Sequence, residues 1–471
     1  MNTIIGRTEH KAKLDAYISG NSSEFIVIYG RRRVGKTFLI REYLGSKFDF
    51  HITGLANAGM KEQLINFHAA IQKYSRKKEP FADTWYNAFQ QLIYLLEHAN
   101  SSRKIIFIDE LPWLDTPKSG FLSALEHFWN HWASARNDVL LIVCGSATSW
   151  ITSKLLNNKG GLHNRVTRKM SIAPFTLKEC EEYLKSKNII FNRYQIVECY
   201  MILGGIPFYM SLLEKGLSLA QNIDKLFFNE SGELRNEFNN LYASLFKNQE
   251  NYVKVVEALA KKAMGLSRDE IIKLTKLSDG GSLTKILQEL EECKFIRKYN
   301  AFNKKTKDGL YQLTDFYTLF YFKYIQKNEY NDSHFWSASI DSAKHRAWCG
   351  YAFEQVCLEH IEQMKRKLGI SGVQCKTASW RSSSVETGAQ IDLLIERKDQ
   401  VINLCEMKYS TDAFLIDKSY DLILRKKISA FRLESKTRKA IHLTMVTTYG
   451  LKQNEYAGMI QNQIVMDDFF E

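Results

Sequence analysis

The stretch FIVIYGRRRVGKTFLI, residues 25–40, decides how the first part of this chain folds. Residues 25–29 are β-branched and aromatic, which predicts a buried strand, and residues 37–44 are expected to form a helix. The loop between them has the spacing GxxxxGKT, at residues 30–37. This spacing in a strand–loop–helix context is typical of a phosphate-binding loop, and a chance glycine-rich turn is the alternative.

The residue types in this loop match the chemistry of a phosphate site. Gly30 and Gly35 allow the backbone to turn so that successive N–H groups point at phosphate oxygens. The next helix offers its first N–H groups and its dipole to the same anion. Lys36 supplies positive charge for the β- and γ-phosphates, and Thr37 supplies a hydroxyl to Mg²⁺. The loop therefore predicts binding of ATP with Mg²⁺.

A second buried strand is expected at residues 105–108, and it ends in Asp109 and Glu110. Ligands of open α/β sheets bind at the carboxyl ends of the strands. We expect this strand to neighbour the strand of the phosphate loop. Asp109 would then hold the Mg²⁺ shell, and Glu110 would orient or deprotonate the attacking water. An ordinary helix N-cap is the alternative explanation for the two carboxylates.

A third buried strand, in VLLIVCGSATSW at residues 139–150, ends in small polar residues. Ser146 follows this strand where a γ-phosphate sensor would lie, although a plain strand exit has the same composition. Farther on, Arg165 or Arg168 is a candidate arginine finger, acting in cis or from a neighbouring subunit. A surface arginine is the alternative for each.

Composition limits the possible classes of protein. The 471 residues suggest three or four domains. The 65 basic and 52 acidic residues give a net charge of +13, which favours a polyanionic partner such as DNA over a basic surface without a partner. The eight cysteines form no C-x-x-C pair, and no apolar run approaches the length of a membrane span. We therefore expect a cytoplasmic protein with reduced cysteines and no membrane partner.

Five segments in order resemble AAA+/STAND-like ATPases of bacteria and archaea: IIGRTEHKAKL, GRRRVGKT, FIDELPWL, CGSATSW and LGGIPFYM. The resemblance implies a multidomain α/β chain with a RecA/AAA+-like parallel sheet in residues 1–170 and a helical lid in residues 171–245. It also implies a possible homo-oligomer. The resemblance places these residues beside the adenine: Gly6, Arg7, Gly204, Gly205, Ile206 and Pro207.

Residues 246–325 have the pattern of a winged helix. Three helices are expected, and the second begins with a capping box of Ser267 and Glu270. A strand, a basic loop and a second strand follow. The third helix of such a fold can enter a major groove and the wing can touch phosphates. The basic residues in question are Lys285, Lys304, Lys305 and Lys307. The acidic residues of the third helix oppose DNA binding, so a protein-contact module is the alternative.

The last part of the chain, residues 335–471, carries a second set of ionisable residues. An amphipathic helix is expected at residues 351–368, with Glu354 at the edge of its apolar stripe. Two strands joined by a tight turn are expected at residues 391–396 and 401–409. Because side chains alternate along a strand, Glu406 and Lys408 share one face.

Asp392 starts the partner strand and is expected to face this pair. The carboxylates of Asp392 and Glu406 suit Mg²⁺, and Lys408 suits a role at the attacking water. The arrangement resembles the PD-(D/E)xK nucleases, with Glu354, Asp392 and Glu406-Met407-Lys408 at the matching positions and no proline before Asp392. This resemblance implies a restriction-endonuclease-like α/β domain. It also implies that a basic helix at residues 417–430, with Lys418, Arg425, Lys426 and Lys427, contacts the nucleic-acid backbone.

Two functions follow from these features. The first is an ATPase that binds DNA and couples its nucleotide state to metal-dependent cleavage of nucleic acid by the C-terminal domain. The second is a non-cutting, ATP-dependent switch whose C-terminal domain is a binding module. The combination of Asp392, Glu406 and Lys408 favours the first.

Overall fold

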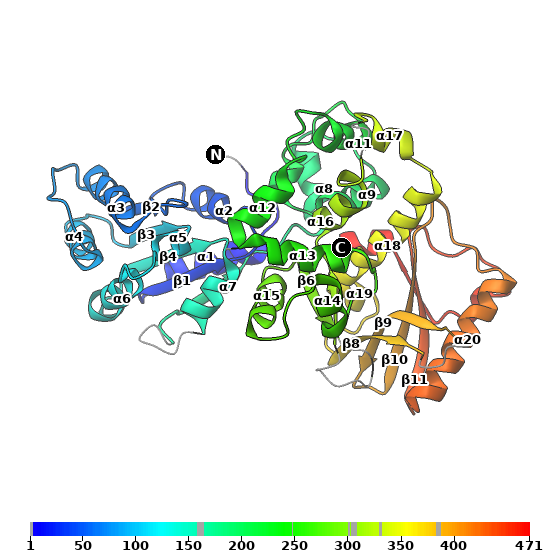
Figure 1. Ribbon diagram of the computed structural model, residues 1–471. Coiled ribbons are helices and arrows are strands. Elements are labelled where there is room, and N and C mark those ends of the chain that lie inside the picture. Colours follow the sequence, from blue (N-terminus) through cyan, green and yellow to red (C-terminus); the bar gives the residue numbers. More distant parts are fainter. Residues whose placement is uncertain are drawn as a thin grey trace. The chain divides into compact units, whose positions relative to one another are not determined.

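The computed structural model describes residues 3–157, 164–246, 248–299, 302, 309–328, 332–382 and 388–471 (Figure 1). The chain divides into two compact units between Pro174 and Phe175. None of the helices in these ranges is long and apolar enough to span a lipid bilayer. All eight cysteines are free thiols.

The first unit is built on a five-stranded parallel sheet in the order β2-β3-β4-β1-β5. Its strands are β1 Glu24–Tyr29, β2 Phe50–Thr53, β3 Lys104–Asp109, β4 Val139–Gly145 and β5 Arg168–Ser171. Its helices are α1 Thr8–Ser19, α2 Lys36–Tyr43, α3 Met60–Ser75, α4 Trp85–Glu97, α5 Leu111–Leu114, α6 Phe121–His127 and α7 Thr148–Ile151. The central strands are apolar along their length because helices cover both faces, as parallel sheets require.

The order of the strands corrects one prediction. The strand of the phosphate loop, β1, pairs with β4 and β5, and β4 pairs with β3. β4 therefore lies between the phosphate loop and Asp109, which were predicted on adjacent strands. All three carboxyl ends still meet at one edge, because the strands are parallel.

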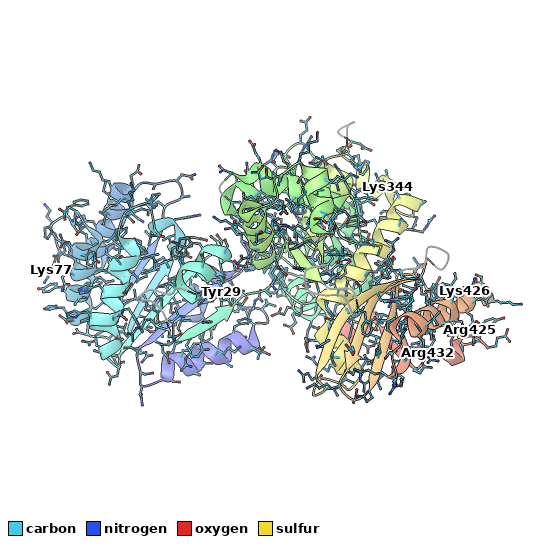
Figure 2. All side chains as sticks on the ribbon, turned by 60° about the horizontal axis from the view of Figure 1, so that its bottom comes forward. Tyr29, Lys77, Lys344, Arg425, Lys426 and Arg432 are labelled. Carbon is cyan, nitrogen blue, oxygen red and sulfur yellow. The ribbon has the colours of Figure 1, made fainter. Side chains whose placement is uncertain are left out.

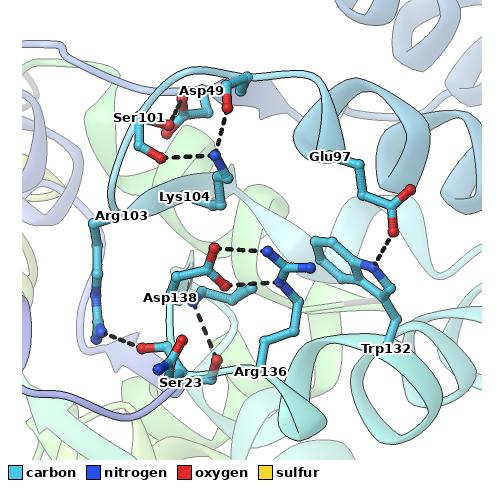
Figure 3. A network of polar contacts seen from close by, with 12 residues as sticks. Ser23, Asp49, Glu97, Ser101, Arg103, Lys104, Trp132, Arg136 and Asp138 are labelled. Carbon is cyan, nitrogen blue, oxygen red and sulfur yellow. Dashed lines mark hydrogen bonds and ion pairs between the residues drawn. The ribbon is translucent and has the colours of Figure 1, made fainter.

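The amino edge of this sheet is held by a network of polar contacts (Figure 3). Lys104 donates to the carbonyls of Ala99 and Ser101 at 2.6 and 2.7 Å, and Arg136 forms a two-bond ion pair with Asp138. These bonds satisfy charged groups where strands begin, away from the edge where ligands of such sheets bind. We assign the network a structural role.

The second unit begins with helices. They are α8 Leu177–Ser186, α9 Arg193–Leu203, α10 Pro207–Met210, α11 Leu219–Ile223 and α12 Glu237–Leu245. Three further helices and a two-stranded antiparallel sheet follow: α13 Gln249–Ala260, α14 Arg268–Thr275, α15 Gly281–Glu292, β6 Ile296–Tyr299 and β7 Leu310–Leu313. The expected capping box opens α14, where Ser267 and Glu270 bond each other's backbone N–H groups.

The C-terminal part is a second sheet with helices, in the strand order β12-β11-β10-β9-β8. Its strands are β8 Cys375–Arg381, β9 Gln390–Arg397, β10 Val401–Lys408, β11 Ala440–Thr447 and β12 Asn462–Val465. The helices are α16 Phe316–Phe320, α17 Phe335–Ser339, α18 Ala343–Glu359, α19 Ile361–Lys367 and α20 Lys418–Ser435. β9 runs antiparallel to β8 and β10, whereas β10, β11 and β12 are parallel.

The prediction of a single helix at residues 351–368 is wrong. Two helices, α18 and α19, meet at His360, and α18 begins at Ala343. The His360 ring explains the break, because its Nε2 accepts the Leu177 backbone N–H at 3.2 Å and its Nδ1 bonds the Val356 carbonyl at 2.8 Å. Burial lowers the pKa of His360 to about 4, so the ring is neutral at pH 7.

The C-terminal part and helix α9 are joined within the second unit. His345 of α18 contacts Glu198 of α9 at 3.2 Å, and Arg193 of α9 pairs with Asp467 at 3.0 Å. The predicted boundaries at residues 245 and 335 therefore fall inside one compact unit.

Candidate functional sites

Backbone geometry explains the glycines of the phosphate loop. Gly30 has a φ of +144°, and a Cβ there would lie 2.2 Å from the carbonyl oxygen of Ile172. Gly35 has a φ of +87° and directly precedes α2. A residue with a side chain would be strained at either position, whereas glycine adopts these angles freely. The loop therefore stays close to the end of β1, and α2 begins at Lys36.

Lys36 lies over this loop. Its Nζ donates to the carbonyls of Gly30 and Arg31 at 2.9 and 2.8 Å. Thr37 follows in the first turn of α2, where the backbone N–H groups of a helix are open to an anion. Arg7, which Gly6 precedes, is buried and donates to the Val34 carbonyl at 3.3 Å. The N-terminal segment is therefore in contact with the loop.

Asp109 and Glu110 lie at the end of β3, and neighbouring groups fix both carboxylates. Oδ1 of Asp109 accepts the Glu110 backbone N–H at 3.0 Å and the Cys144 thiol at 2.6 Å. Oε2 of Glu110 accepts the backbone N–H and the hydroxyl of Ser146 at 3.2 and 3.1 Å. Ser146 therefore holds Glu110, a contact that its prediction as a phosphate sensor did not include. The sequence analysis also missed Cys144, whose only signal was its place at the end of β4.

The electrostatics show that this carboxylate shares an edge with the phosphate loop. Burial raises the pKa of Glu110, the Lys36 ammonium opposes that shift, and Asp109 adds to it. A raised pKa brings a carboxylate closer to the range in which it can accept a proton from water at neutral pH. Glu110 also has a φ of 46°, a left-handed conformation that is uncommon for a residue with a side chain.

The two candidate finger arginines lie elsewhere in this unit. Arg168 starts β5, pairs with Glu24 at 2.9 Å, and lies opposite Ile26 in the β5–β1 register. Ile26 precedes Gly30 by four residues, which is about 13 Å along a strand. Arg165 comes just before β5 and is exposed. Both arginines therefore lie toward the amino edge, which argues against a finger in cis and leaves the neighbouring-subunit alternative as a prediction.

The predicted adenine residues of the second unit form the turn between α9 and α10. Gly204 ends α9 with a φ of +64°, and a Cβ on Gly205 would lie 2.4 Å from the Phe175 carbonyl oxygen. Pro207 and Ile206 open α10. Packing alone thus accounts for both glycines, and a role beside the adenine stays a prediction.

In the C-terminal sheet the register brings two carboxylates opposite each other. β10 and β9 pair antiparallel, with Leu404 against Leu394 and Cys405 against Leu393. One step further along this register, Glu406 stands opposite Asp392. Directly opposed side chains project from the same face, with Cβ atoms about 5 Å apart. Lys408 lies two residues after Glu406 and faces the same way.

Helix α20 covers Glu406. Lys427 pairs with Oε1 of Glu406 at 2.7 Å, and the Tyr420 hydroxyl donates to Oε2 at 3.4 Å. Burial raises the pKa of Glu406 and Lys427 opposes the shift. The Lys408 ammonium lies 5.0 Å from the centre of the Tyr420 ring. Lys427 was predicted to contact nucleic-acid backbone; in the structure it pairs with Glu406, and the backbone contact stays a prediction.

Glu354 of α18 belongs to the same cluster. Burial raises its pKa most, the charges of Asp392 and Glu406 raise it further, and those of Lys408 and Lys427 oppose the shift. These charges act on Glu354 because the helix and the two strands meet there. The four residues singled out from the sequence, Glu354, Asp392, Glu406 and Lys408, therefore come together at the ends of β9 and β10.

The donor set of this cluster fits a hard divalent cation. Mg²⁺ prefers oxygen ligands, keeps several waters, and is usually held by one or two carboxylates. Within the described ranges, no group of three or more His, Cys, Asp or Glu side chains is placed to hold a metal ion. Asp392 and Glu406 therefore offer a two-carboxylate site, which waters or backbone oxygens would complete.

Other basic residues were predicted to contact nucleic acid. Lys418, Arg425 and Lys426 are exposed on α20, the last two labelled in Figure 2, and Arg425 pairs with Asp421 at 2.8 Å. Lys285 is exposed on α15 and lies 3.9 Å from Glu289. The predicted wing lysines, Lys304, Lys305 and Lys307, lie outside the described residues.

Comparisons with known proteins bear on both units. Residues 6–213 match the family described as "ATPase domain predominantly from Archaea". The uncharacterized protein MJECL04 of Methanocaldococcus jannaschii is 28% identical over 411 residues, which cover 86% of this chain and 87% of that protein. Because 411 residues exceed the family segment, this similarity continues into the C-terminal part.

Solved structures also resemble the chain. The Walker-type ATPase paby2304 of Pyrococcus abyssi has a TM-score of 0.49 and 18% identity, over 68% of this chain and 96% of that chain. The ORC2 protein of Aeropyrum pernix, in ADPNP and ADP complexes, has a TM-score of 0.34 and 12% identity, over 66% of this chain and 91% of that chain. The family match, together with the loop and carboxylate geometry, supports an ATPase domain of the phosphate-loop type in residues 6–213.

Proposed function

We propose that this protein hydrolyses ATP and that its nucleotide state controls metal-dependent cleavage of nucleic acid by the C-terminal domain. The observation that carries the proposal is the cluster of Glu354, Asp392, Glu406 and Lys408. Bringing three carboxylates together costs free energy unless a cation neutralises them. Burial raises the pKa of Glu354 most, and the charges of Asp392 and Glu406 raise it further.

For ATP hydrolysis, we assign each residue of the first site a role. Lys36 and the loop N–H groups bind the phosphates, and Thr37 and Asp109 hold Mg²⁺. Glu110 accepts a proton from the attacking water or orients it. The two hydrogen bonds from Ser146 keep the Glu110 carboxylate in one place.

For cleavage, Asp392 and Glu406 hold the divalent ion, which when bound acidifies a water and neutralises charge at the phosphate. Lys408 shares their face and would orient the attacking water or offset the phosphate charge. Glu354 closes the cluster from α18, and its pKa is raised to about 8, so without a cation beside it this carboxyl holds a proton at neutral pH.

The decisive experiment incubates the purified full chain with labelled DNA and RNA, in Mg²⁺, Mn²⁺ or EDTA, with and without ATP. Asp392→Ala and Lys408→Ala should each abolish cleavage and leave ATP hydrolysis largely intact. Asp399→Ala is a matched control, because Asp399 lies in the turn between β9 and β10 and pairs with Arg397. Cleavage that persists in both variants, or in EDTA, would assign the activity to another site or a contaminant.

A second candidate function is a non-cutting, ATP-dependent switch. One observation favours it: Lys427 neutralises Glu406 at 2.7 Å, so this carboxylate is satisfied without a metal. In that case no nucleic acid would be cut with any divalent ion. A protein partner would instead bind or leave when ATP replaces ADP, as a pull-down in the two nucleotides would detect.

We also propose that α13–α15 and the β6–β7 sheet form a winged helix that binds DNA. The exposed Lys285 of α15 is one candidate contact. Because each phosphate contact releases counterions, affinity should fall steeply with salt. Reversing Lys304, Lys305 and Lys307 to glutamate should weaken binding regardless of sequence. An unchanged salt dependence would indicate a protein-contact module.

A trans-acting Arg165 would require a homo-oligomer. Light scattering in ATP tests for one, and Arg165→Ala should lower ATP turnover only where subunits associate. If the chain stays a monomer in ATP, Arg165 is a surface residue.

A further inference from the structure

A cavity of about 510 Å³ opens between the β6–β7 sheet and the C-terminal sheet, within the second unit. Glu354 and Asp392 of the acidic cluster line one wall. Residues of β6 and of the segment before α14 line the other. The volume is within the range of about 300–1,000 Å³ typical of ligand sites.

The two walls are joined by direct contacts. Phe302, just beyond β6, donates its backbone N–H to the Ser379 carbonyl of β8 at 2.8 Å. Its ring packs at 5.2 Å against Phe431 of α20. The β6–β7 sheet is therefore held against the C-terminal sheet, and the cavity between them is a built feature of this unit.

The lining carries charges of both signs. Its basic groups are Lys262, Arg297, Lys298 and Arg381, and its carboxylates are Glu354, Glu359 and Asp392. Gln312 orients the Arg297 guanidinium by accepting from its Nε at 2.9 Å and also from an Nη nitrogen. Burial lowers the pKa of Arg297 and the Glu359 charge opposes that shift. A phosphate placed between this guanidinium and a cation on Glu354 and Asp392 would bind to both.

Aromatic side chains complete the lining. Tyr299 of β6, Tyr351 of α18 and Trp380 of β8 all face the cavity. Aromatic rings beside basic groups are the elements with which proteins bind single strands, because every base has a face that can stack. Stacking on these rings requires an unpaired base, because the bases of a duplex are already stacked on one another.

We propose that this cavity binds single-stranded nucleic acid, with the phosphate to be cut between Arg297 and the carboxylates Glu354 and Asp392. The inference deepens the proposed nuclease function and rests on it. It makes the β6–β7 sheet part of the substrate site, with Arg297 binding phosphate and Tyr299 stacking on a base.

The test measures fluorescence anisotropy of labelled single-stranded and duplex oligonucleotides with the full chain, with Ca²⁺ replacing Mg²⁺ so that bound strands stay intact. Wild type should prefer the single strand. Arg297→Ala should weaken single-strand binding by about 10- to 100-fold, as expected for a lost charge-assisted bond. Arg297→Lys should restore part of the affinity. Lys225→Ala is the control, since Lys225 lies outside the proposed winged helix and pairs with Glu214 at 2.7 Å.

A second pair of variants guards against a folding defect in Arg297→Ala. Tyr299→Leu should weaken single-strand binding, whereas Tyr299→Phe, which keeps the ring, should bind nearly as wild type does. Equal affinity for duplex and single strand, or unchanged binding in Arg297→Ala, would overturn the inference while cleavage by wild type still upheld the proposed nuclease. If single-strand binding depends on Arg297 but nothing is ever cut, the nuclease fails and the cavity is a binding site.

Discussion

The nucleotide site and the acidic cluster both place carboxylates at the ends of buried strands, but they neutralise them differently. The Glu110 carboxylate accepts hydrogen bonds from two neutral donors, the backbone N–H and the hydroxyl of Ser146. Glu406 pairs with the Lys427 ammonium at 2.7 Å. Neutral donors fix a carboxylate and leave its charge available, whereas an ammonium cancels that charge.

This difference indicates what each site needs before it can act. Glu110 is already oriented, so under the proposed function the nucleotide would bind to a carboxylate that needs no rearrangement. If Glu406 binds a cation as proposed, metal binding would compete with its ion pair to Lys427. The acidic cluster is therefore the site at which binding of metal or substrate should change local interactions most.

The largest expected effect tests the nucleotide side of the comparison. Glu110→Gln should lower ATP turnover by about 10²- to 10⁴-fold, because the water loses its general base, while nucleotide binding persists. Phosphate release and calorimetric titration measure the two quantities. Glu97→Gln is the control, since Glu97 accepts from the Trp132 indole at 2.9 Å in the amino-edge network (Figure 3). Unchanged turnover in Glu110→Gln would remove Glu110 from the mechanism.

Lys427→Ala tests the ion pair of the acidic cluster. Glu406 is 2% exposed and Lys427 is 18% exposed as side chains, so removing the ammonium should lower the free energy of unfolding by about 3 kcal/mol. Urea unfolding in EDTA measures this loss. Lys426→Ala, the exposed neighbour on α20, should cost little.

The same variant distinguishes a metal site from a switch. In Lys427→Ala the carboxylates lack their internal cation, so Mg²⁺ should stabilise the variant more than it stabilises wild type. Equal stabilisation of the two proteins would argue against metal binding at Glu406.

Ser146→Ala tests whether neutral donors position Glu110. The variant keeps the backbone N–H bond and loses the hydroxyl, so we expect a loss of about tenfold in turnover, comparable to one hydrogen bond to a charged group. Ser146→Thr retains a hydroxyl and should recover most of the activity. A loss as large as that of Glu110→Gln would mean that Ser146 itself contacts the nucleotide.

The smallest effect concerns pH. The pKa of Glu354 is raised in the folded protein by burial and by Asp392, so the folded state binds more protons than the unfolded state above the ordinary carboxyl pKa. Stability without metal should therefore fall as pH rises from that ordinary value toward the raised one. Glu354→Gln should remove this part of the slope, as unfolding measured across pH would show. An identical slope in the variant would place the proton uptake on another group.

Local sequence was sufficient for the elements whose chemistry is local. The phosphate loop needs two glycines, a lysine and a threonine at a fixed short spacing, and α2 begins within one residue of the predicted start. The capping box of Ser267 and Glu270 is a contact within one turn, and it opens α14 as predicted. Alternation along β9 and β10 placed Glu406 and Lys408 on one face.

Contacts between residues far apart in the sequence could not be predicted from local patterns. The break at His360 depends on a hydrogen bond from Leu177, nearly two hundred residues earlier in the chain. The position of β4 between β1 and β3 depends on how the crossovers wind, which spacing does not specify. The Arg168–Glu24 pair places that arginine toward the amino edge, a position that no motif indicates.

The sequence by itself determined the residues of both candidate sites, because phosphate and metal chemistry select residue types and short spacings. Only the tertiary structure decided how their charges are balanced. The fold brings Ser146 into a hydrogen bond with Glu110 and Lys427 into an ion pair with Glu406. It also sets residues of the β6–β7 sheet around the same cavity as Asp392. The physical reason is that a buried charge is stabilised by whichever groups the fold brings within a few ångströms, and chain packing sets those distances.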